Sequence, residues 1–161
     1  LPLPEAEMAV VAPPPRPADP QVAAVSLGGL RILSADDSAT NREVLGRMLE
    51  PSGAQIRQAE NGQEALDLWL AAHAAGTPFD IALLDITMPV RDGLSAITEI
   101  RRIEAERGYP LMPAVAVTAN AMPDQVAEYV MRGFDTHLAK PFNKRDLMHS
   151  VTSLVRVSAG V

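Results

Sequence analysis

The chain of 161 residues carries 20 acidic and 14 basic side chains and a formal net charge of −6, which argues against a nucleic-acid-binding surface. It contains no cysteine, so disulfide frameworks and thiolate metal sites are excluded. No run approaches the roughly 18 consecutive apolar residues of a membrane-spanning helix, so we expect a soluble cytoplasmic domain with one core.

Residues 1–26 are rich in proline and small residues, with no periodicity that could bury a face. They hold half of the 14 prolines of the chain, which predicts an extended, poorly ordered linker without a specific function. No basic segment followed by an apolar core indicates a signal peptide. The linker, and a first residue other than Met, suggest a piece of a longer protein in which another module precedes a folded domain at residues 27–161.

Short apolar runs alternate with stretches of helical spacing through the rest of the chain. Turn residues separate them, among them Pro51-Ser52-Gly53, Gly108 and Gly133. The runs predict five strands, at residues 30–35, 55–59, 81–84, 114–118 and 136–139. This alternation predicts an α/β fold with a doubly wound, five-stranded parallel sheet and helices on both faces.

The third strand organises the chain. The run from Ile81 to Leu84 is apolar throughout, which is typical of a strand buried on both faces. It ends on Asp85, after which Pro89 and Asp92-Gly93 turn the chain. An acid at the carboxyl end of a buried parallel strand lies where α/β sheets bind ligands. Taken alone, such an Asp is about as often only a helix cap, so both interpretations stay open at this point.

Polar side chains also follow the other strands. Asp36 and Asp37 follow the first strand, Thr118 ends the fourth, and Lys140 follows the fifth. In a flavodoxin-like strand order 2-1-3-4-5, with strands numbered along the chain, the crevice opens between strands 1 and 3, where the acids are. Neighbouring carboxylates repel each other unless a cation intervenes, and an all-oxygen cluster fits Mg²⁺ best. Metal, acid, hydroxyl and ammonium together are typical of a phosphoryl-transfer site.

These residues resemble the receiver domain of two-component response regulators over about residues 30–157. The motifs that carry the resemblance are Asp36-Asp37, Asp85 with Met88-Pro89 and Asp92-Gly93, Thr118-Ala119, and Lys140-Pro141. Further segments resemble receivers attached to hybrid sensor histidine kinases, namely Asn41-Arg42, Met88-Pro89-Val90 and Thr118-Ala119-Asn120-Ala121.

The resemblance implies a role for each of these residues. Asp85 would accept a phosphoryl group from a phosphohistidine of a histidine kinase or a histidine phosphotransfer protein. Asp37 and Asp85, with the backbone carbonyl of Thr87, would bind Mg²⁺, and Asp36 would act mainly through a metal-bound water. Thr118 and Lys140 would contact the phosphoryl oxygens as the other catalytic residues, and the Lys140–Pro141 bond would be cis. Thr87 and Asn120 would border the path of the attacking water and tune dephosphorylation.

One position departs from the family pattern. Three residues before the Lys, where receivers usually have Tyr or Phe as a rotating switch residue, this chain has His137. Imidazole gains less than a Tyr or Phe ring from burial, and its charged form would resist burial near Lys140. We therefore expect weak inward rotation of His137, with the signal carried more by the loop Thr118-Ala119-Asn120.

The other histidines have no sequence neighbours that suggest a ligand or a base. His73 and His149 are predicted to be solvated helix residues, and Trp69 a core residue. The charged run from Glu99 to Glu104 predicts an amphipathic helix with a solvated charged face.

Three other functions stay open. An aspartyl-nucleophile phosphatase would want a second acid two residues after Asp85, where this chain has Thr87. A flavin-binding domain of the same fold would want a donor-rich loop where Asp36-Asp37 lie. A receiver that acts only as a scaffold would not require every site residue. A homodimer through strand 136–139 and its flanking helices stays open as well, and the signal, output and cognate partner cannot be read from the sequence.

Overall fold

All five predicted strands are present, and they run parallel in one sheet. The computed structural model describes residues 28–159, so the linker predicted at residues 1–26 lies outside the described residues. The strands are β2 (Arg31–Ala35), β3 (Gln55–Ala59), β4 (Ile81–Asp85), β5 (Ala114–Thr118) and β6 (Thr136–Ala139). Their order in the sheet is β3-β2-β4-β5-β6, which is the predicted order 2-1-3-4-5.

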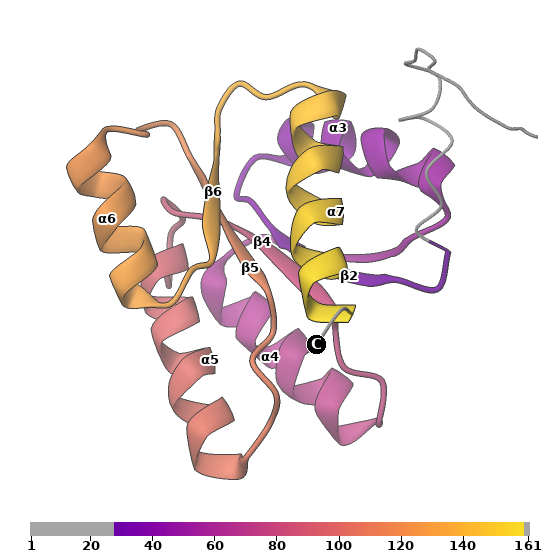
Figure 1. The fold of residues 1–161 in the computed structure, drawn as a ribbon, viewed down its shortest axis with the longest axis vertical. Coiled ribbons are helices and arrows are strands. Elements are labelled where there is room, and N and C mark those ends of the chain that lie inside the picture. The colour runs from indigo at the N-terminus through magenta and orange to yellow at the C-terminus, as the bar shows by residue number, and fades with distance from the viewer. Residues whose placement is uncertain (1–27, 160–161) are drawn as a thin grey trace, which may run out of the picture.

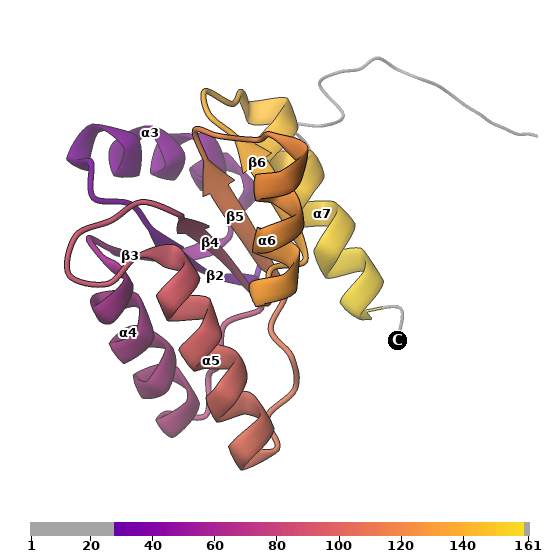
Figure 2. The ribbon, with the colours of Figure 1, turned by 90° about the vertical axis from the view of Figure 1, so that its left-hand side faces the viewer.

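Helices cover both faces of this sheet, as Figures 1 and 2 show. They are α3 (Ala39–Leu49), α4 (Gly62–Ala74), α5 (Gly93–Arg107), α6 (Pro123–Arg132) and α7 (Lys144–Ala159), with a short 3₁₀ helix, η2 (Glu50–Ser52), after α3. Helices α3 and α7 pack on one face, while α4, α5 and α6 pack on the other. Across residues 28–159, no helix combines the length and the apolar character needed to cross a membrane.

The pleat of the strands divides the core into two layers, because successive side chains face opposite sides of a sheet. In β2, Ile32 lies in the layer with α3 and α7, and Leu33 lies in the layer with α4, α5 and α6. All five residues of β4 are buried. Its continuous apolar run is therefore explained by its central place, where helices cover both faces.

Side-chain caps begin helices α3, α4 and α5 at the carboxyl edge of the sheet, and Asn143 caps α7 in the same way. Ser38, Asn61 and Asp92 each accept a hydrogen bond from the backbone N–H three residues later. Each cap follows its strand by a short loop, so the first turns of α3, α4 and α5 surround the edge where the strands end. At the opposite end of α5, Gly108 adopts φ = 71°, which favours glycine and ends the helix.

Two sequence interpretations of surface residues need correction. Trp69 is in the core as predicted, but His73 is half-buried, stacked on the ring of Tyr109 at 3.9 Å between ring centres. Desolvation by this packing lowers the pKa of His73. The charged run in α5 is likewise only partly solvated, because Glu104 is 1% exposed. In both cases a neighbouring element covers a side chain whose own helix pattern gave no sign of the contact.

Candidate functional site

Three carboxylates converge where β2 and β4 end. Asp85 is the last residue of β4, and Asp36 and Asp37 directly follow the neighbouring strand β2, whose Ala35 pairs with Leu84. Oxygen atoms from these three side chains lie within 4.8 Å of one another. Asp36 and Asp85 are buried, whereas Asp37 is exposed. The structure thus brings together the acids that the sequence places at separate strand ends.

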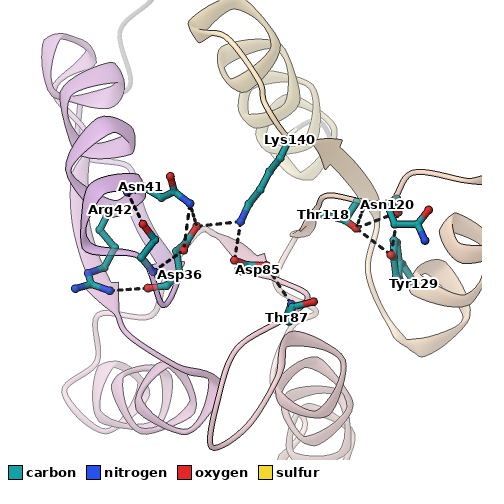
Figure 3. A network of polar contacts seen from close by, with 10 residues as sticks. Asp36, Asn41, Arg42, Asp85, Thr87, Thr118, Asn120, Tyr129 and Lys140 are labelled. Carbon is teal, nitrogen blue, oxygen red and sulfur yellow. Dashed lines mark hydrogen bonds and ion pairs between the residues drawn. The ribbon is translucent and has the colours of Figure 1, made fainter.

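Lys140 neutralises part of this acidic cluster (Figure 3). It follows β6 directly, and its Nζ lies 2.7 Å from Oδ2 of Asp85 and 3.3 Å from Oδ2 of Asp36. The backbone N–H of Lys140 donates to the carbonyl oxygen of Thr118 at 2.7 Å, and the Lys140–Pro141 bond is cis, as the resemblance implies. Three carboxylates opposite one ammonium leave an excess of negative charge.

Burial dominates the electrostatics of Asp85. Desolvation raises its pKa, and the hydrogen bonds from Lys140 and from the Thr87 backbone oppose this rise without cancelling it. Burial alone would lower the pKa of Lys140, but its hydrogen bond and charge attraction to Asp85 outweigh burial, and the pKa rises. The two shifts are consistent because the Asp85 side chain is only 6% exposed, against 25% for Lys140. The ion pair thus offsets the desolvation of the Lys140 ammonium fully and the desolvation of the Asp85 carboxylate only in part.

The two acids after β2 have different surroundings. Oδ1 of Asp36 accepts the Ser38 backbone N–H at 2.9 Å, and the Asn41 amide nitrogen lies 3.3 Å from Oδ2. Arg42 donates to the backbone carbonyl of Asp36 at 2.7 Å. Within residues 28–159, no hydrogen bond or ion pair engages the Asp37 carboxylate. From the sequence, Asn41 and Arg42 are only marks of a subfamily. In the structure, both side chains contact Asp36 and hold it in place.

The loop after β4 fits closely around Asp85. The Thr87 backbone N–H donates to Oδ1 of Asp85 at 3.0 Å, and a Cβ at Gly93 would overlap the Asp85 carbonyl oxygen. Only glycine therefore allows this approach. Val90 in the same loop has φ = 68° and is 82% exposed, a strained conformation for a β-branched residue. The carbonyl of Thr87 stays a predicted metal ligand.

Thr118 lies at the same edge, but its hydroxyl contacts other groups than Asp85. Thr118 is 3% exposed, and its Oγ1 accepts the Asn120 backbone N–H at 2.9 Å. The same Oγ1 lies 3.0 Å from the hydroxyl oxygen of Tyr129, a buried residue of α6. Figure 3 shows the three residues grouped to one side of Asp85. Nothing in the sequence pattern indicates the contact of Tyr129 with Thr118.

His137 is a half-buried residue of β6. It pairs with Ala116 of β5, which belongs to the core layer of α4, α5 and α6. No hydrogen bond, ion pair or ring contact engages its side chain in the part of the chain that the structure describes. Its expected weak rotation stays a prediction, as do the tuning roles of Thr87 and Asn120.

Comparisons with known proteins agree with this geometry. Residues 32–152 match the family model described as the response regulator receiver domain. The peroxide stress-activated histidine kinase mak1 of Schizosaccharomyces pombe is 34% identical over 127 residues, which are 79% of this chain and 8% of that kinase. The sensor histidine kinase GacS of Pseudomonas protegens is 34% identical over 121 residues, 75% of this chain and 13% of GacS. The chain thus spans only a small part of the curated relatives that it matches.

Solved structures give the same result. The receiver domain of sensor histidine kinase PA1611 from Pseudomonas aeruginosa PAO1, which has a magnesium ion coordinated in its active site cleft, is 30% identical with a TM-score of 0.67. That match covers 80% of this chain and 99% of the PA1611 chain. The receiver domain of Ssk1 from Saccharomyces cerevisiae, crystallised with the histidine phosphotransfer signaling protein Ypd1, is 25% identical with a TM-score of 0.72, covering 81% and 91% of the two chains. The chain therefore belongs to the family of response regulator receiver domains, the modules through which two-component phosphorelays pass their signal.

Proposed function

We propose that Asp85 accepts a phosphoryl group from a phosphohistidine in a Mg²⁺-dependent reaction. The observation that carries the proposal is the contact of 2.7 Å between Lys140 Nζ and Asp85 Oδ2 inside a cluster of three carboxylates. A nucleophilic carboxylate needs a cationic group beside it that can hold the oxygens of the transferred phosphoryl group. Lys140 is in that position.

The donor set of the cluster fits Mg²⁺. Its side-chain ligand atoms are all carboxylate oxygens, and the excess negative charge calls for a divalent cation. Asp37, Asp85 and the Thr87 carbonyl would hold the ion, and Asp36 would act mainly through a metal-bound water. The exposed Asp37 carboxylate and the engaged Asp36 carboxylate support this division of roles. When bound, the ion would neutralise charge on the carboxylates and on the phosphoryl group.

The residues of the chain account for each step of the transfer. An oxygen of Asp85 forms a bond to phosphorus while the bond from phosphorus to the donor imidazole breaks, and its electron pair stays on the imidazole nitrogen. Lys140 and Thr118 then hold phosphoryl oxygens by charge-assisted hydrogen bonds. Thr87 and Asn120 carry no strong acid or base, so they would affect the later attack of water by position and access.

A cavity beside the site supports a phosphohistidine protein as the donor. It has a volume of about 470 Å³ and lies between α3 and the segment after β6. Asp36 and Lys140 line its polar part, while Val44, Met48 and Phe142 line its apolar part. A histidine presented by a phosphotransfer protein could reach Asp85 while that protein covers Val44, which is 44% exposed. The complex of Ypd1 with the Ssk1 receiver supports this class of partner.

The comparisons support a place in a hybrid sensor histidine kinase. The kinases mak1 and GacS are similar to this chain over a small part of their own length. We therefore propose that this chain is the receiver portion of such a kinase, with residues 1–26 as its linker.

Labelling with acetyl phosphate and Mg²⁺, followed by intact-mass spectrometry, tests the proposal. The protein should gain one phosphoryl group, Asp85→Asn should gain none, and the exposed control Asp67→Asn should label like the wild type. Val44→Asp should keep this labelling but slow transfer from a phosphohistidine protein. Equal labelling of Asp85→Asn would refute the assignment of Asp85. Steady turnover of a small phosphate ester without a covalent adduct would indicate a phosphatase. No labelling of the wild type at all would indicate a scaffold.

A further inference from the structure

We propose that Tyr129 is a positioning residue for Thr118 and links the phosphorylation state of Asp85 to helix α6. The Tyr129 hydroxyl and a phosphoryl group on Asp85 compete for the Thr118 hydroxyl. This inference rests on the proposed function, since it requires a phosphoryl group at Asp85.

Three oxygen atoms form a closed triangle beside the site (Figure 3). Oγ1 of Thr118 and the hydroxyl oxygen of Tyr129 are 3.0 Å apart, and each also lies 3.0 Å from the backbone carbonyl oxygen of Asn120. The Asn120 backbone N–H donates to Thr118 Oγ1 at 2.9 Å. The Tyr129 hydroxyl therefore contacts both the Thr118 hydroxyl and the Asn120 carbonyl oxygen that can accept the Thr118 hydrogen.

A count of hydrogen atoms shows that one edge of the triangle always lacks a hydrogen. Only two hydroxyl hydrogens, one from Thr118 and one from Tyr129, serve its three edges. If the Thr118 hydrogen turns to a phosphoryl oxygen, the Tyr129 hydrogen is the only one left for the Asn120 carbonyl. Tyr129 is 2% exposed, so water does not readily replace a partner that it loses. A change at Thr118 thus alters the hydrogen-bonding network in which the buried Tyr129 hydroxyl takes part.

Helix α6 depends on this tyrosine for its attachment. Tyr129 is the only buried residue between Pro123 and Arg132, and no side chain caps the helix N-terminus. The next two residues, Val130 and Met131, are 51% and 85% exposed. A rearrangement at the Tyr129 hydroxyl would therefore move a weakly anchored helix and the apolar surface that it presents.

This route bypasses His137. Ala116, which pairs with His137 in the sheet, belongs to the same core layer as Tyr129. Residue 137 and Tyr129 therefore lie on the same side of the sheet. Tyr129 already holds the hydrogen bond to Thr118 from the helix, and the coupling needs no aromatic residue at position 137.

Fluorine NMR on protein labelled with 3-fluorotyrosine gives a direct test. The chain has two tyrosines, so Tyr109, which follows α5, is an internal control. Beryllofluoride with Mg²⁺, as a mimic of the phosphoryl group, should shift the Tyr129 resonance and leave the Tyr109 resonance nearly unchanged. Tyr129→Phe and Tyr109→Phe assign the two signals. An unmoved Tyr129 signal with beryllofluoride bound would overturn the inference.

A double-mutant cycle separates coupling from packing. Tyr129→Phe keeps the buried ring but removes the competing hydroxyl, so it should tighten beryllofluoride binding about two- to tenfold, as expected for one hydrogen bond. In a Thr118→Ala background the same change should have no effect, and Tyr109→Phe should be neutral in both. Unchanged or weaker binding of Tyr129→Phe, or an equal effect without Thr118, contradicts the competition. Failure of the wild type to bind beryllofluoride would instead overturn the proposed function together with this inference.

Discussion

At the residue scale, Asp36 and Asp37 are adjacent in sequence but differ in what their carboxylates can do. Asp36 is 8% exposed and is already engaged by the Ser38 backbone N–H and by Lys140. Asp37 is exposed at the rim of the same cluster. A cation that approaches from solvent therefore meets Asp37 without displacing an existing contact, whereas Asp36 would have to exchange one.

This difference predicts unequal effects on Mg²⁺ affinity. Asp37→Ala removes a proposed direct oxygen ligand and should weaken binding about tenfold or more, a loss of at least ~1.4 kcal/mol. Asp36→Ala should weaken it less, because the Asp36 carboxylate is proposed to act through a metal-bound water and not as a direct ligand. Isothermal titration calorimetry measures both, with the exposed Asp67→Ala as control. A larger loss in Asp36→Ala would reverse the proposed division of roles.

The sequence predicted the site residues that directly follow strands, and it missed those that helices contribute. Asp85, Thr118 and Lys140 could be found because the carboxyl ends of parallel strands meet at one edge whatever the details of packing. Tyr129 could not, because its contact with Thr118 depends on how helix α6 packs against the end of β5. Helical periodicity indicates that a residue faces inward but not which polar atom it meets there.

At the element scale, helix α5 is joined to its neighbours by a buried ion pair. Glu104 is 1% exposed, and its two oxygens accept hydrogen bonds from Arg101 at 2.8 Å and from the Met112 backbone N–H at 2.9 Å. Arg101 also donates to the carbonyl of Gly133 at 2.9 Å. These contacts connect α5 to the segment that enters β5 and to the end of α6.

Removing the buried carboxylate should therefore be costly. Glu104→Ala leaves the Met112 N–H without an acceptor and Arg101 without its buried partner, a loss of about 2–4 kcal/mol, given that Arg101 keeps other acceptors and some exposure. For a domain of this size that corresponds to a fall in Tm of roughly 5–15 °C. The matched control is Glu106→Ala, which breaks an exposed pair with Arg102 on the same helix and should change Tm far less. Thermal unfolding followed by circular dichroism compares them, and equal shifts would mean that burial adds nothing to the Glu104 contacts.

At the scale of the whole molecule, the strand order assembles the candidate site and also places like charges close together, which destabilises the fold. The order β3-β2-β4-β5-β6 brings the ends of β2 and β4 together, and with them three carboxylates around one ammonium. The alternation of strands and helices predicted the parallel sheet with helices on both faces, whereas the strand order came from the flavodoxin-like arrangement. The domain boundary near residue 27 stays a prediction from composition alone. Carboxylates held this close together repel each other, and the rest of the fold must outweigh that repulsion.

Asp85→Asn should consequently stabilise the fold when Mg²⁺ is removed by a chelator. The pKa of Asp85 is raised in the folded state, so its contribution to stability is greatest below the ordinary Asp pKa of about 3.9 and is lost as the pH rises through the folded-state pKa. At pH 7 the neutral amide avoids this loss, and Lys140 keeps Asp36 as a partner. We expect a gain of about 0.5–2 kcal/mol in unfolding free energy at pH 7, which shrinks as the pH falls through the folded-state pKa of Asp85.

Mg²⁺ should narrow or reverse the difference in unfolding free energy between Asp85→Asn and the wild type, because a cation at 100 times its Kd stabilises the wild type by about 2.7 kcal/mol. Chemical denaturation at several pH values, with chelator or Mg²⁺, measures these differences. A variant less stable than the wild type at pH 7 in chelator would show that the pair with Lys140 outweighs the burial of Asp85.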